Sequence, residues 1–206
     1  METHPLTLIV TLILAGLAGF LIWRTRNRKK ISPAPARTPA RVTASGGDTP
    51  SEDFLNRAIA ALRSGQTHSA TGFAEEGLRS NPGNRRVRAS LLNVLGNAQV
   101  SEKNYDAGER WFREAADTDP AFSFPHSNLG NLYFIRGRFE EAESAYREAL
   151  RLDPHYADAY NNLGTLYKKE QRIDEAVHAF EKALELNPGM EGVRRNLDYL
   201  KRFRKE

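Results

Sequence analysis

The sequence predicts an all-α protein: a stack of about three and a half to four helical hairpins with a C-terminal capping helix. One transmembrane helix and a disordered linker are predicted to precede the stack. Three observations predict this fold. Pro120, Pro154 and Pro188 recur at a spacing of 34 residues. The segments between them carry apolar residues at helical spacing, and an uncharged apolar run stands near the start of the chain.

Composition limits the classes of function. The chain has 206 residues, 40% hydrophobic and 27% charged, as in ordinary globular proteins. It contains no cysteine, which excludes disulfides, thiol catalysis and cysteine-ligated zinc. Residues 1–50 hold seven Lys and Arg against two Asp and Glu, whereas residues 51–206 hold 23 against 24. The predicted helical stack is therefore nearly neutral, and we expect no nucleic-acid partner.

The uncharged run LTLIVTLILAGLAGFLIW occupies residues 6–23, after a short tail of residues 1–5. As a helix it would span about 27 Å, close to the hydrocarbon core of about 30 Å. A cleaved signal peptide carries its positive charge before the apolar stretch, but residues 1–5 contain no Lys or Arg. The run is therefore predicted to be a retained transmembrane helix. The basic segment that follows it, residues 24–30, contains Arg24, Arg26, Arg28, Lys29 and Lys30.

This basic segment also predicts the topology. Positively charged flanks stay in the cytoplasm, so the N-terminus would face outward and the helical stack would be cytoplasmic. We expect a single-pass protein, most simply in the inner membrane of a bacterium. The five basic side chains would also suit anionic lipid headgroups, although a topology signal alone explains them equally well.

Three small residues in the predicted span, Thr11, Ala15 and Gly19, lie four residues apart on one helical stripe. Small residues at this spacing let two membrane helices approach closely, which predicts a weak homodimer. The alternative is that small residues are simply common in membrane helices.

Residues 31–50, ISPAPARTPARVTASGGDTP, contain four prolines and few large apolar groups. Such a segment cannot bury enough surface to offset its ordering entropy. We predict a semi-extended tether that reaches at most about 60 Å. A short recognition motif inside it is the alternative to a plain spacer.

The segments between the repeated prolines share one register. LGNAQ at 95–99, LGNLY at 129–133 and LGTLY at 163–167 stand at equivalent places, and small and aromatic residues follow each of them. A fixed period of this length is typical of stacked units that cannot bury their apolar faces alone. The recurring structural positions are Gly96, Gly130, Gly164, Ala142, Ala176, Ala149, Ala183, Pro120, Pro154 and Pro188.

Each unit is predicted to consist of two helices. In the last unit the first helix covers about 157–169 and the second about 174–186, where NPG ends it. Gly164 would lie where the two backbones approach closely, with large neighbours filling the space around the crossing. Glycine inside a helix costs up to about 1 kcal/mol, so we expect packing to compensate for it.

This pattern of bulky residue, Leu-Gly, Tyr, Ala, aromatic residue, Ala and Pro resembles the tetratricopeptide repeat (TPR) family. The match is complete in 123–156 and 157–190 and partial in 89–122. Residues 51–88 resemble a degenerate first repeat, with four extra residues near RRVR that we expect to add one helical turn. Residues 191–206 resemble the capping helix that closes such arrays. The resemblance implies a TPR α-solenoid.

The resemblance also implies a concave groove lined mainly by the first helices of the repeats. An asparagine amide offers both a donor and an acceptor, so a row of them can hold the backbone of an extended peptide. The alternative is that these are neutral, soluble residues on a helix face. The predicted peptide-binding residues are Asn93, Asn97, Asn128, Asn131, Asn161, Asn162, Thr165 and Asn196.

Some TPR proteins clamp the C-terminal carboxylates of chaperones with Lys and Arg beside such asparagines. The sequence keeps Asn97 and Asn128, but Asn93 and Asp158 stand where the resemblance implies lysine, and Asn162 where it implies arginine. The acidic Asp158 would repel a carboxylate, so we do not expect chaperone-tail binding.

No catalytic pattern occurs in the sequence. The five histidines are scattered, and there is no zinc-binding histidine spacing, phosphate-binding loop or nucleophile elbow. We therefore predict no enzymatic activity, metal or cofactor.

The function predicted from these observations is a membrane-anchored scaffold that binds partner proteins or peptides in the concave TPR groove. Two alternatives use the same array: an envelope-facing factor for cytochrome or outer-membrane complex assembly, and an organelle import receptor. A subunit docked permanently in a membrane complex is a further class.

Overall fold

The computed structural model of the chain describes residues 50–203, which form helices joined by short turns. The predicted transmembrane helix 6–23, its Thr11, Ala15 and Gly19 stripe and the basic segment 24–30 lie outside the described residues. Within 50–203, no helix is long and apolar enough to cross a membrane. The helices are α2 (Pro50–Arg63), α3 (Thr67–Arg79), α4 (Arg85–Ser101), α5 (Tyr105–Thr118), α6 (Ser123–Ile135), α7 (Phe139–Leu152), α8 (Ala157–Lys169), α9 (Ile173–Leu186) and α10 (Glu191–Phe203).

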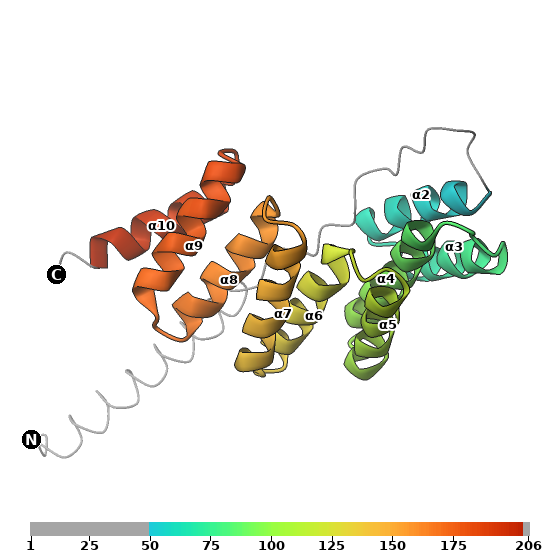
Figure 1. Cartoon of the computed structure of the whole chain (residues 1–206), viewed down its shortest axis with the longest axis horizontal. Helices are drawn as coiled ribbons and strands as arrows, with labels where there is room; N and C mark the ends of the chain where they lie inside the picture. The colour runs from blue at the N-terminus through green and yellow to red at the C-terminus, as the bar shows by residue number, and fades with distance from the viewer. Residues whose placement is uncertain (1–49, 204–206) are drawn as a thin grey trace, which may run out of the picture. The chain divides into compact units, whose positions relative to one another are not determined.

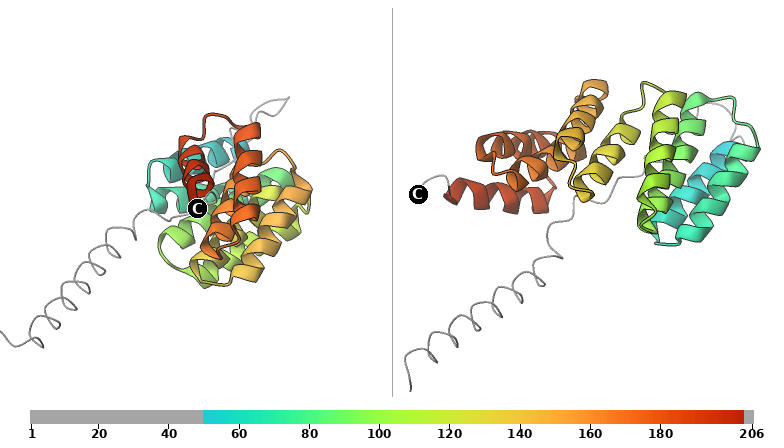
Figure 2. Two further views of the ribbon diagram at one scale, coloured as in Figure 1. Left: turned by 90° about the vertical axis from the view of Figure 1, so that its left-hand side faces the viewer. Right: turned by 90° about the horizontal axis from the view of Figure 1, so that it is seen from below.

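Consecutive helices pair into hairpins, as Figures 1 and 2 show: α2 with α3, α4 with α5, α6 with α7, and α8 with α9. The first helices of neighbouring hairpins also contact one another, α2 with α4, α4 with α6, and α6 with α8. The last helix, α10, packs against α9. The predicted stack of helical hairpins with a closing helix is therefore confirmed for the described residues.

Helix lengths follow the sequence register. The first helix predicted at 157–169 is α8, with the same bounds. Helix α4 has 17 residues where α6 and α8 have 13, so the four extra residues near RRVR do form one more helical turn. The turn after α6 uses Gly137 in the left-handed conformation, at φ 76°. Lys103 and Gln171 take the same conformation after α4 and α8 without being glycine.

In three of the hairpins, α4–α5, α6–α7 and α8–α9, an aromatic ring of the second helix lies directly on a glycine of the first. A Cβ atom added to Gly130 would stand 2.5 Å from Cε1 of Tyr146. An added Cβ at Gly96 would stand 2.5 Å from the Phe112 ring, and one at Gly164 would stand 2.8 Å from the Phe180 ring. The close approach predicted from the small residues is therefore present in three hairpins.

The ring of Tyr146 has no room to move away from Gly130. Its side chain is completely buried, and its hydroxyl donates a hydrogen bond of 2.7 Å to Oδ1 of Asn131. Burial also raises the pKa of the Tyr146 phenol, which keeps it neutral. The hydrogen bond and the glycine contact together fix how α7 lies on α6.

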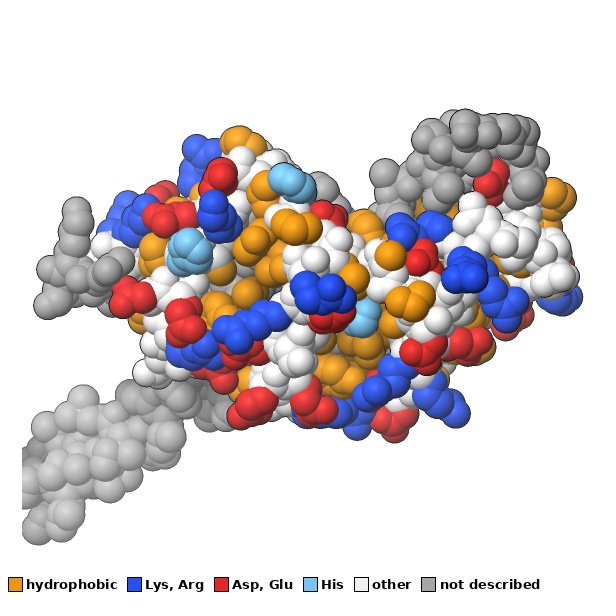
Figure 3. Space-filling view, in the orientation of Figure 1, with side chains coloured by type: hydrophobic (Ala, Val, Ile, Leu, Met, Phe, Trp, Pro, Cys, Tyr) orange, Lys and Arg blue, Asp and Glu red, His pale blue; other side chains and the backbone are white. Residues whose placement is uncertain are grey.

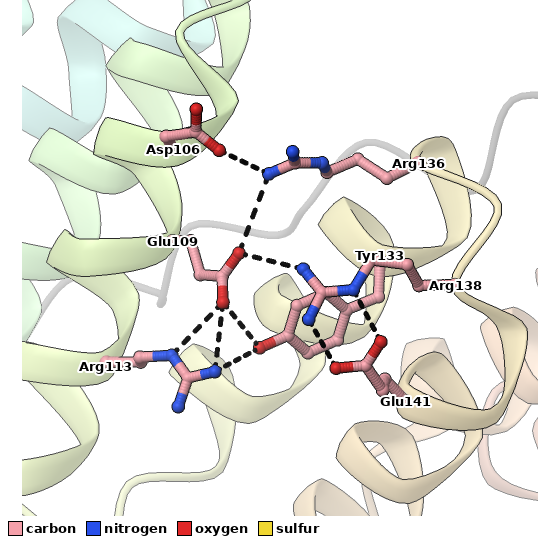
Figure 4. A network of polar contacts seen from close by, with 7 residues as sticks. All are labelled: Asp106, Glu109, Arg113, Tyr133, Arg136, Arg138 and Glu141. Atoms are coloured by element: carbon pink, nitrogen blue, oxygen red, sulfur yellow. Dashed lines mark hydrogen bonds and ion pairs between the residues drawn. The ribbon is translucent and has the colours of Figure 1, made fainter.

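A carboxylate on the second helix of one hairpin gathers donors from the next hairpin (Figure 4). Glu109 on α5 accepts hydrogen bonds from Arg113 on the same helix, at 3.0 Å, and from the Tyr133 hydroxyl of α6, at 3.1 Å. Arg138, at the start of α7, donates to the other oxygen of Glu109 at 3.2 Å. Its guanidinium also lies over the Tyr133 ring, 4.3 Å from the centroid. This network joins α5 to the α6–α7 hairpin.

The same arrangement recurs 34 residues later in the sequence. Glu143 on α7 pairs with Arg147 at 2.7 Å, accepts from the Tyr167 hydroxyl at 2.9 Å, and accepts from Arg172 at 2.7 Å. The pattern changes at the last interface, where Glu181 of α9 pairs with Lys201 of α10 at 2.7 Å. Two successive hairpin junctions are thus held by one repeated polar network.

The glycine contact can be tested by replacing Gly130 with alanine. We expect Gly130→Ala to lower the free energy of unfolding by about 1–3 kcal/mol, because the new methyl group has no space beside the Tyr146 ring. The matched control is Gly72→Ala on α3, where an added Cβ would meet nothing within 4 Å. Since alanine favours helix, the control should be neutral or slightly stabilising. Equal effects in urea unfolding followed by circular dichroism would contradict the close contact.

The repeated network predicts a pH-dependent contribution from Glu143. The hydrogen bond from Arg172 is the main cause that lowers the pKa of Glu143 below its ordinary value of 4.5. The ionised carboxylate therefore stabilises the fold above this ordinary pKa, which the unfolded chain has, and the stability is lost as the pH falls through the lower folded pKa.

We therefore expect Glu143→Gln to cost about 1–2 kcal/mol at neutral pH and progressively less as the pH is lowered below the ordinary pKa of the carboxyl group. Unfolding in urea across this pH range measures the difference. Glu185→Gln is the control, because Glu185 is exposed and pairs only locally with Lys182, at 2.7 Å, in the described structure. The idea fails if the two variants lose the same stability, or if the loss from Glu143→Gln persists in acid.

Candidate functional site

The predicted binding asparagines come from three successive first helices. Because α4 contacts α6 and α6 contacts α8, side chains at equivalent positions of these helices form one row. We call this row the asparagine face; its residues are Asn93 and Asn97 on α4, Asn128 and Asn131 on α6, and Asn161 and Asn162 on α8.

Two members of the asparagine face are bonded to each other across neighbouring repeats. Nδ2 of Asn128 donates a hydrogen bond of 2.8 Å to Oδ1 of Asn93, and both side chains are buried. The bond leaves Nδ2 of Asn93 and Oδ1 of Asn128 buried without a hydrogen-bond partner. Two amides joined head to tail thus keep one donor and one acceptor unused. A peptide unit, with its own C=O and N–H, is the complement of this pair.

Ser90 adds a third unpartnered atom to the same stretch of α4. Its hydroxyl oxygen is buried and has no hydrogen-bond partner. Ser90 stands three residues before Asn93, on the same side of the helix. Each unpaired buried polar atom costs about 1–3 kcal/mol, a cost that a ligand group or an ordered water would remove. Ser90 was not predicted from the sequence, although its equivalence with Asp158 in the repeat register could have identified it.

Other predicted site residues are engaged within the protein. Oδ1 of Asn131 accepts the Tyr146 hydroxyl, so this oxygen belongs to the core contact beside Gly130. Nδ2 of Asn97 donates to the Asn93 carbonyl at 3.0 Å, and the Thr165 hydroxyl donates to the Asn161 carbonyl at 2.9 Å. Such bonds within one helix orient these side chains without stabilising the stack.

The amides of Asn161 and Asn162 lie side by side on α8. Nδ2 of Asn161 stands 3.4 Å from Oδ1 of Asn162, a long hydrogen bond between sequence neighbours. Both side chains are buried. Asp158 lies on the same helix and is only 8% exposed. It is the one charged residue in the row that consists of Asp158 and the six residues of the asparagine face.

Asn196 lies apart from this row, in the contact between α8 and α10. Its Oδ1 accepts a hydrogen bond of 2.9 Å from Nζ of Lys168. The Lys168 ammonium also lies 5.1 Å from the centroid of the Tyr199 ring, and burial lowers the Lys168 pKa. The structure therefore joins Asn196 and Lys168 in the closing contact of the stack, where both groups have partners.

The charged side chains do not form a single-sign surface. On the face drawn in Figure 3, basic and acidic groups are interspersed. Among residues 50–203, no group of three or more His, Asp or Glu is placed to hold a metal ion. The polar chemistry available in the row is that of neutral amides beside one carboxylate.

Comparison with family models gives three matches. A model described as TPR repeat matches residues 130–171, and models described as tetratricopeptide repeat match residues 55–121 and 157–190. The match to residues 55–121 includes most of the α2–α3 hairpin, which was predicted from the sequence to be a degenerate first repeat. A search of curated proteins found no match.

Several solved structures are similar to this chain. The first TPR of Spaghetti (RPAP3), bound to the HSP90 peptide SRMEEVD, is 26% identical with a TM-score of 0.55, over 57% of this chain and 94% of that chain. The second TPR domain of human RPAP3, in complex with the HSP70 peptide SGPTIEEVD, is 25% identical with a TM-score of 0.53, over 57% and 98%. YrrB, described as a TPR protein with an unusual peptide-binding site, shares the fold at 18% identity and a TM-score of 0.55, over 71% and 73%.

Proposed function

Because the chain belongs to the tetratricopeptide repeat family, we propose that it is a membrane-anchored scaffold that binds an extended segment of a partner protein along the asparagine face. Repeats of this family generally act as interaction scaffolds.

The observation that carries the binding site is the Asn93–Asn128 pair. Its free Nδ2 and Oδ1 atoms are buried and unpartnered. An extended backbone passing over α4 and α6 would accept from the first atom and donate to the second, and would remove the cost of leaving both unpaired. Recognition through the backbone gives affinity without demanding a particular sequence.

The RPAP3 domains bind peptides that end in EEVD, a sequence with three carboxylate side chains. This likeness supports peptide binding by the present chain. The asparagine face, however, contains no cation, and the nearby Asp158 is an acidic residue. Its electrostatics therefore favour a neutral or basic segment over an acidic tail, because like charges in a poorly hydrated site repel strongly.

Attachment to a membrane is proposed from the sequence. Residues 6–23 are long and apolar enough to span a bilayer, and the basic segment 24–30 that follows them would keep the repeats in the cytoplasm. The same array placed on the other side of the membrane would serve as an envelope assembly factor. An import receptor of an organelle would share this layout, and a subunit docked in a membrane complex would hold its partner permanently.

Peptide binding is tested with the double variant Asn93→Ala/Asn128→Ala. Peptides are first selected from a random displayed library on the full chain in detergent micelles, and their dissociation constants are then measured by fluorescence polarisation. We expect the double variant to bind the selected peptides at least about tenfold more weakly, since two buried hydrogen bonds are lost. Its helical circular dichroism should stay unchanged.

The control for this experiment is Asn104→Ala. Asn104 is exposed in the turn between α4 and α5, and its side chain does not cap α5. Equal affinity of the control and the double variant for the selected peptides would place the binding site elsewhere on the repeats.

Membrane attachment is tested by deleting residues 1–30. We expect the full chain to remain in the pelleted membranes of a bacterial host after an alkaline wash, and the shortened chain to leave them. Deletion of residues 42–47 is the control, because it shortens the linker and keeps the span. If the repeats are digested by protease added to intact spheroplasts, the cytoplasmic orientation is wrong and the envelope-facing alternative holds.

A further inference from the structure

A partly buried aromatic ring adjoins the Asn93–Asn128 pair on α6. Phe124 stands four residues before Asn128, so the two side chains lie on the same side of the helix, about 6 Å apart along its axis. In the repeat register, Phe124 is the equivalent of Ser90 on α4, whose buried hydroxyl has no hydrogen-bond partner. The ring therefore borders the place where the three unpartnered atoms of α4 and α6 lie.

Neighbouring rings hold Phe124 in position. Its ring centroid lies 5.4 Å from that of Phe122 and 4.8 Å from that of Tyr156. The Arg86 guanidinium lies over the Phe122 ring, 4.6 Å from the centroid. Phe122 and Tyr156 are buried, whereas Phe124 keeps part of its surface exposed. Phe124 is thus the most accessible ring of a packed aromatic cluster, and it offers a preformed apolar contact surface.

The amide pair by itself does not distinguish a peptide from water. Nδ2 of Asn93 and Oδ1 of Asn128 need an acceptor and a donor, and an ordered water supplies both. A peptide gains a clear advantage over water only if it also buries apolar surface, because that burial is the larger favourable contribution. An apolar contact beside the amides would also exclude water from the two hydrogen bonds and strengthen them. Phe124 supplies such a contact.

The spacing on α6 determines where the apolar group stands in the bound segment. An extended chain advances about 3.3 Å for each residue, and alternate side chains point to the same side. The distance of about 6 Å between Phe124 and Asn128 along the helix axis therefore corresponds to two residues of an extended segment.

We infer that the partner segment carries a large apolar side chain, aromatic or branched aliphatic, which packs on the Phe124 ring within two residues of the peptide group that pairs with Asn93 and Asn128. The inference rests on the proposed peptide-binding function and specifies the class of ligand. The amide pair binds the backbone of the segment, and Phe124 selects one of its side chains. Phe124 is thereby a specificity-determining residue.

A double-mutant cycle between chain and peptide tests this contact. Peptides are selected from a random displayed library on the full chain in detergent micelles, and the selected sequences should share a large apolar residue. Replacing that residue by alanine in a synthetic peptide should weaken binding to the original chain at least about tenfold. The same replacement should weaken binding to the Phe124→Ala chain less than about threefold, because the partner ring is already missing.

Two further variants separate the contact from a loss of stability. Phe124→Leu keeps an apolar surface and should retain peptide affinity within about threefold. Phe139→Ala removes another partly buried ring, which packs on Phe134 with a centroid distance of 5.8 Å, and should leave peptide affinity unchanged. Urea unfolding followed by circular dichroism verifies that each variant is folded under the binding conditions. The residue shared by the selected peptides is read on the original chain and depends on no variant.

The inference is overturned if the selected peptides share no large apolar residue, or if its replacement weakens binding equally to the original chain and to Phe124→Ala. In either case the proposed function stands when Asn93→Ala/Asn128→Ala reduces affinity and Asn104→Ala does not. Unchanged affinity of Asn93→Ala/Asn128→Ala, or failure to select any peptide, overturns the proposed function and this inference with it.

Discussion

The contact of an aromatic ring with a helical glycine is the constraint on which the rest of the structure depends. In three hairpins the ring of Phe112, Tyr146 or Phe180 fills the place that a Cβ atom would take on the partner helix. Only glycine lets the two backbones come this close, and the ring fills the space that the missing side chain leaves. The hairpin geometry that follows determines where every other side chain of the repeat stands.

The polar groups on the two sides of each repeat differ in kind. Toward the second helices, Glu109 and Glu143 hold neighbouring hairpins together through charged groups that already have partners. Toward the first helices, the asparagine face offers neutral amides, and two of its atoms are left without a partner. A satisfied ionic network stabilises the stack, whereas an unsatisfied amide pair costs stability unless something binds to it.

This division also explains how the chain differs from its peptide-binding relatives. The RPAP3 domains are complexed with acidic peptides ending in EEVD. Here Lys168 is engaged by Asn196 in the closing contact, and Asp158 stands beside the amides instead of a lysine.

The sequence by itself determined the hairpins, their number from residue 89 onward, the extra turn of α4 and the glycine contacts. Each of these follows from local spacing, because a 34-residue period and small residues at helical intervals constrain the backbone wherever they occur. The start of α9 differed by one residue from the prediction, at Ile173, since helix ends depend on the turn before them.

Only the tertiary structure decided which amides are free. Asn131 is tied to Tyr146 and Asn196 to Lys168, whereas Asn93 and Asn128 bond to each other and keep one donor and one acceptor. The partners in these bonds stand between 15 and 35 residues apart in the chain. Whether these side chains meet depends on how the hairpins fold and stack. The spacing of residues along the sequence does not specify the distances between side chains.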